Sequence, residues 1–112
     1  MKNNHIDYIE FKATDLKAIK AFYSNCFDWE FTDYGPDYCS FSKSGVYGGF
    51  EKTTDPVVNG PLVVLYHKDL EGIREIILNA GGELVRDIFS FPGGRRFHFK
   101  DPSGNELAVW SE

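Results

Sequence analysis

The chain has 112 residues, of which 42% are hydrophobic and 26% charged, a composition typical of one globular domain and not of a disordered chain. Its formal net charge is −5 and it has no basic run, so we expect no nucleic-acid partner. No apolar stretch approaches the roughly 20 residues that a membrane span needs, and Met1–His5 leads into a strand instead of a signal-peptide core. We therefore expect a cytoplasmic protein with no membrane partner, in which Cys26 and Cys39 are reduced packing residues.

The first half of the chain predicts a strand, a helix and three further strands. Alternating residues favour a strand over Ile6–Lys12, with both faces largely buried, and an apolar stripe favours a helix over Asp15–Phe27. Three short apolar runs follow, separated by the turn signals Gly35-Pro36-Asp37 and Lys43-Ser44-Gly45. We expect these runs to be antiparallel strands, at Trp29–Asp33, Tyr38–Ser42 and Val46–Glu51.

A linker-like segment at about residues 53–60 divides the chain near its middle, and the same order of elements follows it. The pattern predicts a strand over Leu62–His67 and a helix over Asp69–Ala80. Gly81-Gly82 ends this helix, where a left-handed cap favours residues without a Cβ. Turn residues then separate three more predicted strands, at about Glu83–Phe89, Arg95–Lys100 and Glu106–Trp110.

The two halves repeat one pattern. Asp15 and Asp69 lie 54 residues apart, and each precedes an apolar stripe with helical spacing. In this position a carboxylate can accept hydrogen bonds from the free N–H groups of the first helical turn. At this offset five apolar stripe positions match: Leu16, Ile19, Phe22, Tyr23 and Cys26 fall on Leu70, Ile73, Ile76, Ile77 and Ala80. The sequence therefore predicts an α+β fold with a single domain over residues 1–112, built from two tandem β-α-β-β-β modules at about residues 5–52 and 61–112.

Two local signatures accompany this repeat. In the first module Thr14-Asp15-Leu16 leads to Ala21-Phe22-Tyr23 and Phe27-Asp28-Trp29, and near the end stands Asp101-Pro102-Ser103-Gly104-Asn105. Together they resemble the vicinal oxygen chelate superfamily, which includes glyoxalase I, fosfomycin- and bleomycin-resistance proteins and extradiol dioxygenases. The resemblance covers essentially the whole chain. It implies that the modules form an eight-stranded cup with a small-molecule ligand between them, and that the protein is a homodimer.

The resemblance also locates the divalent metal site of the family, and this sequence departs from it. Family members place His ligands at the positions of Tyr8 and Leu62, a Glu at the position of Ala108 and, where present, a further ligand at or beside Gly48-Gly49. Leu and Ala cannot coordinate a cation, and a phenol must first lose a proton with a pKa of about 10. We therefore expect no metal in the usual position and no other cofactor.

The same register predicts which side chains line the cup. A strand turns alternate residues to one face, so Glu10 lies with Tyr8, and both Glu106 and Trp110 lie with Ala108. In some resistance members of the family, cup-facing polar residues also stand three and five positions before the Asp-Pro turn. The expected ligand-binding residues are Tyr8, Glu10, Leu62, Tyr66, Arg96, His98, Glu106, Ala108 and Trp110.

Three functions remain open at this point. The first is metal-independent binding of an aromatic or cationic small molecule by stacking and by attraction to an acidic protein. The second is a glyoxalase-like (lactoylglutathione-lyase-like) enzyme, with Glu10, His98 and Glu106 holding a metal or with Glu10 and His98 as acid and base. The third is an interaction module whose cup is filled by its own side chains. Glu10 and Arg96 could also pair across the cup as a structural bridge.

Overall fold

The computed structural model describes residues 2–112, so Met1, at the start of the segment expected to lead into the first strand, lies outside the described residues. The first module contains β1 (Tyr8–Ala13), α1 (Leu16–Phe27), β2 (Glu30–Asp33), β3 (Tyr38–Ser42) and β4 (Tyr47–Lys52). The second contains β5 (Val63–Tyr66), α2 (Leu70–Asn79), β6 (Glu83–Phe91), β7 (Gly94–Lys100) and β8 (Glu106–Ser111). Every predicted helix and strand is present, and its ends differ from the prediction by two residues at most.

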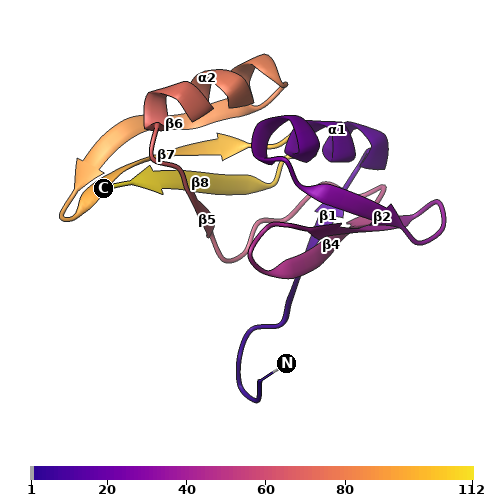
Figure 1. The fold of residues 1–112 in the computed structure, drawn as a ribbon. Helices are drawn as coiled ribbons and strands as arrows, with labels where there is room; N and C mark the ends of the chain where they lie inside the picture. The colour runs from indigo at the N-terminus through magenta and orange to yellow at the C-terminus, as the bar shows by residue number, and fades with distance from the viewer. Residues whose placement is uncertain (1) are drawn as a thin grey trace.

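The strands form two four-stranded sheets, one from each module. Sheet 1 has the order β1-β4-β3-β2, and sheet 2 repeats it as β5-β8-β7-β6. In each sheet the first pair is parallel and the other pairs are antiparallel. The two sheets lie beside each other, and both helices lie on the same side of them (Figure 1). The predicted fold class, two tandem β-α-β-β-β modules, is confirmed.

The two helices begin at the predicted caps. The Asp15 carboxylate accepts a hydrogen bond from the N–H of Ala18 at 3.1 Å, and the Asp69 carboxylate accepts one from Gly72 at the same distance. After α2, Gly81 adopts a left-handed backbone with φ of +103°, as the pair of glycines predicts. Within residues 2–112, neither helix is long and apolar enough to cross a membrane.

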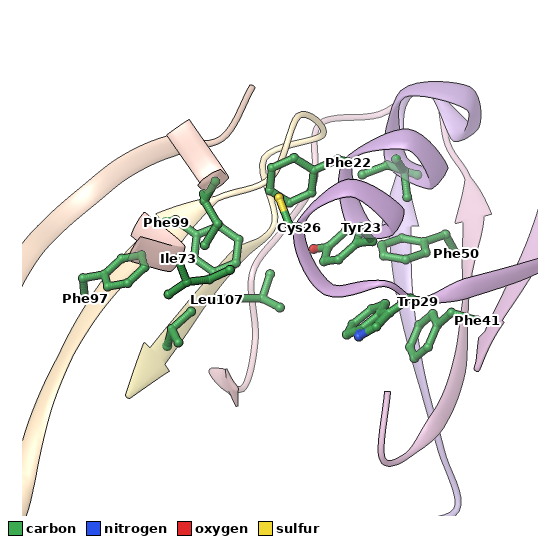
Figure 2. Packing of buried hydrophobic residues seen from close by; sticks show 14 of the residues in the cluster. Phe22, Tyr23, Cys26, Trp29, Phe41, Phe50, Ile73, Phe97, Phe99 and Leu107 are labelled. Carbon is green, nitrogen blue, oxygen red and sulfur yellow. The ribbon is translucent and has the colours of Figure 1, made fainter. Parts of the chain in front are cut away.

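One aromatic core lies between the helices and the sheets. Tyr23 stacks on Trp29 with ring centroids 4.7 Å apart, and Phe22 reaches Phe99 of the second module at 6.1 Å. In Figure 2, Phe22 and Cys26 of α1 lie between a group from the first module and a group from the second. Those groups are Tyr23, Trp29, Phe41 and Phe50 on one side and Ile73, Phe97, Phe99 and Leu107 on the other. Cys26 and Cys39 are both free and buried, as the sequence predicts.

The helices cover only one face of each sheet. Along β1, burial alternates, so that Phe11 and Ala13 pack toward the core while Tyr8, Glu10 and Lys12 remain exposed. The expectation that both faces of this strand are buried is therefore wrong, because no element in residues 2–112 packs over the second face. We call the faces turned away from the helices the open faces of sheet 1 and sheet 2.

The turn Asp101–Asn105 connects the two modules. Asp101 is only 4% exposed, and its carboxylate accepts hydrogen bonds from the Tyr23 hydroxyl at 2.8 Å, the Ser103 N–H at 2.9 Å and the Asn105 N–H at 3.0 Å. The Asn105 side-chain amide then donates to the Lys12 carbonyl oxygen in β1 at 2.8 Å. Burial raises the pKa of Asp101, and the hydrogen bonds offset part of that rise. This turn signature therefore has a structural role.

Replacing Asp101 with Ala should lower the free energy of unfolding by about 3 kcal/mol, because several buried donors lose their acceptor at a cost of roughly 1–3 kcal/mol per group. Tyr23→Phe removes one donor from the same cluster and should cost only about 1 kcal/mol. Urea unfolding followed by tryptophan fluorescence measures both values. Equal losses in the two variants would show that the carboxylate is not the centre of the cluster.

Candidate functional site

The register of sheet 2 arranges the side chains of its open face in two rows. The first row runs across four strands through Tyr66, Trp110, Arg96 and Phe89. The second runs through Val64, Ala108, His98 and Arg86. Six of the predicted ligand-binding residues therefore share one face: Tyr66, Arg96, His98, Glu106, Ala108 and Trp110. Their role in binding stays a prediction.

Two irregularities in β6 add side chains that sequence reasoning missed. The register shifts once between Leu84 and Arg86 and again between Arg86 and Phe89. Arg86 and Phe89 are three positions apart, so an unbroken strand would turn them to opposite faces. The shifts, which are β-bulges or similar irregularities, instead place Arg86 opposite His98 and Phe89 opposite Arg96. Alternation in the sequence gives no signal for such a shift.

The arginines of this face make cation–π contacts with phenylalanine rings. The guanidinium carbon of Arg86 lies 3.6 Å from the centre of the Phe89 ring, and that of Arg96 lies 5.3 Å from the same ring and 5.6 Å from Phe91. Within residues 2–112 neither arginine forms a salt bridge. The salt bridge between Glu10 and Arg96 that the sequence suggested is not formed within residues 2–112. Glu10 instead lies 3.7 Å from the Lys12 ammonium.

His98 is held by a carboxylate on one side and has a free nitrogen on the other. Its Nδ1 lies 3.0 Å from Glu106 Oε2, and its side chain is 13% exposed. The second ring nitrogen, Nε2, is buried without a hydrogen-bond partner in residues 2–112, and the same holds for Nε of Arg96. A buried nitrogen without a hydrogen-bond partner lowers the free energy of unfolding by about 1–3 kcal/mol. When Nδ1 donates to Glu106, Nε2 is a base in the neutral ring and a donor in the protonated ring.

A pair of tyrosines occupies the open face of sheet 1. The hydroxyls of Tyr8 and Tyr38 lie 2.5 Å apart, directly above Gly49. A Cβ on Gly49 would come within 2.6 Å of both hydroxyls, so only glycine leaves room for the pair. Burial raises the pKa of Tyr38 well above its usual range, and hydrogen bonds to Tyr8 and Glu10 raise it further.

The residues at the family's metal positions do not fit a divalent ion. The Tyr8 hydroxyl is hydrogen-bonded to the Tyr38 hydroxyl, and the side chains of Leu62 and Ala108 have no atoms that could coordinate a metal. Gly48-Gly49 also lacks a donor side chain, and a Cβ on Gly48 would clash with the carbonyl oxygen of Ile9. Within residues 2–112 no three His, Cys, Asp or Glu side chains gather closely enough to hold an ion.

The substitute metal set that the sequence left open is therefore not assembled. His98 and Glu106 are in contact on sheet 2, whereas Glu10 lies on sheet 1 beside Lys12. Glu10 and Glu106 do line one crevice, of about 530 Å³, between the edges of the two modules. Its other walls are formed by Ile6, Tyr8, Ile9, Phe11, Lys12, residues 58–61, Val63 and Asn105.

A second cavity of about 380 Å³ lies between the modules, lined mainly by apolar side chains that include Phe11, Trp29 and Tyr66. Leu62 precedes β5 and is 37% exposed, but it does not line either space. The structure thus brings Tyr8, Glu10 and Glu106 to the crevice and Tyr66 to the second cavity.

A comparison with models of known protein families identifies the family of this chain. The sequence model of the Glyoxalase/Bleomycin resistance protein/Dioxygenase superfamily matches residues 5–109 of the chain. The chain belongs to this superfamily. The vicinal oxygen chelate resemblance predicted from the sequence is therefore confirmed. A search of curated proteins finds no match.

Solved structures of this superfamily have the same fold. A glyoxalase/bleomycin resistance protein/dioxygenase family enzyme from Burkholderia phytofirmans PsJN superposes with a TM-score of 0.82 at 14% identity, over 95% of this chain and 98% of its own. A glyoxalase-related enzyme from Fulvimarina pelagi gives 0.79 at 22% identity, over 97% and 88%. A mutant of the fosfomycin resistance protein FosX from Listeria monocytogenes, complexed with Mn(II) and 1S,2S-dihydroxypropylphosphonic acid, gives 0.82 at 17% identity, over 96% and 90%.

Tyr38 should ionise at a higher pH than free tyrosine, because its environment raises the pKa of the phenol. The folded protein then keeps a proton that the unfolded chain loses above about pH 10, so the free energy of unfolding falls as the pH rises through that range. Ultraviolet difference titration of the wild type against Tyr38→Phe isolates this group. Tyr34→Phe, which removes a tyrosine that is 65% exposed, controls for the loss of one ring. Ionisation of Tyr38 at the ordinary tyrosine pH would contradict the structure.

Proposed function

We propose that this superfamily member binds a small molecule between its two modules without a divalent metal. The observation that carries the proposal is the crevice of about 530 Å³, whose walls combine Tyr8 and apolar side chains with three charged groups, those of Glu10, Lys12 and Glu106. Small-molecule sites are mostly apolar concave surfaces with a few placed polar groups. The adjacent apolar cavity, which Tyr66 and Trp29 line, extends the space that a ligand could use.

The chemistry of the donor set supports the metal-free part of the proposal. The FosX mutant was solved with Mn(II), but at the family's ligand positions this chain has Tyr8, Leu62 and Ala108. The phenol of Tyr8 is already hydrogen-bonded to Tyr38. A phenol must also lose its proton before it can bind a cation well.

The contact between His98 and Glu106 favours a second candidate, a metal-independent enzyme. A carboxylate at one ring nitrogen orients the imidazole and leaves the other nitrogen to exchange a proton with a substrate. Glu10, the other catalytic candidate, has no contact with this pair in residues 2–112 and binds Lys12 instead. The interaction module with a filled cup has less support, since Tyr8 is 45% exposed and Tyr66 is 50% exposed.

The homodimer and the cytoplasmic location that the sequence led us to expect stay predictions. Size-exclusion chromatography with light scattering tests the first, for which the expected mass is about twice 12.8 kDa.

Metal should not stabilise the protein. Elemental analysis after dialysis against Ni²⁺, Zn²⁺ and Mn²⁺ should give no stoichiometric metal, and the melting temperature should not change, because no set of donors is assembled in residues 2–112. Tight binding of one ion per chain would overturn the metal-free proposal and direct attention to Glu10, His98 and Glu106.

A thermal-shift screen of small aromatic compounds, with anionic, neutral and cationic members, should find compounds that raise the melting temperature. Val58 is 90% exposed at the rim of the crevice, so Val58→Trp should obstruct the crevice and reduce the shift without disturbing the core. Val85→Trp changes an exposed valine of β6 in the same way and should leave the shift intact. A screen without any stabilising compound would contradict the proposed function.

A further inference from the structure

The open face of sheet 2 has two arginines that form no salt bridge among the described residues, in a protein whose formal net charge is −5. Its two rows contain Arg86, Arg96 and His98, and the next row of the same face contains Glu106, Lys100 and Glu83. Glu106 pairs with His98, and the other salt bridges of residues 2–112 use Lys12, Lys20, Lys43, Arg74 and Arg95. Within residues 2–112, no carboxylate therefore pairs with Arg86 or Arg96.

Two buried nitrogen atoms on this face lack a partner. Arg96 and His98 are two positions apart in β7 and point to the same side, and neither Arg96 Nε nor His98 Nε2 has a hydrogen bond within residues 2–112. A guanidinium can only donate, and a protonated imidazole beside Glu106 donates as well. An acceptor with a negative charge satisfies both groups at once.

Phenylalanine rings lie next to both guanidinium groups. Arg86 lies over one ring at 3.6 Å, and Arg96 lies near two rings. Stacking occupies the face of a guanidinium and leaves the N–H groups at its edge available for two oxygen atoms of one oxyanion. Rings that hold the side chains in place also reduce the entropy that they lose when a ligand binds.

An aromatic surface adjoins this cationic group. Trp110 lies directly opposite Arg96 in the register, and its ring meets Tyr66 edge to face at 5.2 Å. We infer that the open face of sheet 2 binds an aromatic oxyanion, with the carboxylate, phosphate or phosphonate at Arg96, Arg86 and His98 and the ring against Trp110. The inference rests on the proposed function and adds a ligand class to it, because Tyr66, which contacts Trp110, also lines the apolar cavity between the modules.

Isothermal titration of the full chain with benzoate, phenylphosphonate, benzamide and benzylamine tests the charge preference. Benzoate or phenylphosphonate should bind at least about tenfold more tightly than benzamide and benzylamine, because only the anions pair a negative charge and two acceptor oxygens with a guanidinium. The ratio between the two anions distinguishes a carboxylate site from a phosphonate or phosphate site. Binding of benzamide or benzylamine as tight as that of either anion would overturn the inference and leave the proposed function intact.

Variants of neighbouring arginines locate the site. Arg96→Met keeps an apolar stem and should weaken anion binding by about tenfold or more, since the charged donor is lost. Arg95→Met removes the same charge from the next residue, whose guanidinium pairs with Glu71, and should leave the affinity unchanged. Arg86→Met, at an exposed position, tests the face again if Arg96→Met unfolds. Equal affinities in the Arg95 and Arg96 variants would overturn the assignment.

Failure of this inference differs from failure of the proposed function. If all four compounds fail to bind but the broader screen finds a neutral or cationic binder, the oxyanion class is wrong and a small-molecule site remains. If no compound of any class binds, both proposals are wrong.

Discussion

The relative placement of the two modules depends on a buried carboxylate. Asp101 accepts hydrogen bonds from its own turn and from Tyr23 of α1, and Asn105 of the same turn reaches the backbone of β1 at Lys12. The helix of one module is thereby fixed to the last turn of the other. β8 begins just after this turn, so the carboxylate also sets where Glu106 meets the crevice.

Much of this fold could be predicted because its signals are local. Helical periodicity, two aspartate caps and the turn residues depend only on neighbours in the sequence, and the repeat showed that both halves follow one plan. Exposure of one face of β1 could not be predicted, because alternation shows which residues share a face and not what covers that face. The bulged stretch of β6 was missed for a related reason, since Arg86 and Phe89 share a face only after the register shifts.

The candidate site shows the same division between local and distant information. The sequence correctly indicated that donor atoms are lacking at Leu62 and Ala108, but not that Tyr8 would meet a phenol 30 positions away. Overall acidity suggested a cationic ligand. The structure shows which charges are paired, and within residues 2–112 Arg86 and Arg96 of sheet 2 contact phenylalanine rings and no carboxylate.

The 54-residue repeat constrains the folding of the two modules but not the chemistry of their open faces. Each module needs the features that let it fold, and Asp15 and Asp69 cap their helices in the same way. The side chains that point away from the core are not needed for folding in this way, and equivalent positions contain Tyr8 in one module and Leu62 in the other. The open face of one module has a pair of phenols and that of the other has two guanidinium groups, so one repeated architecture presents two chemically different walls.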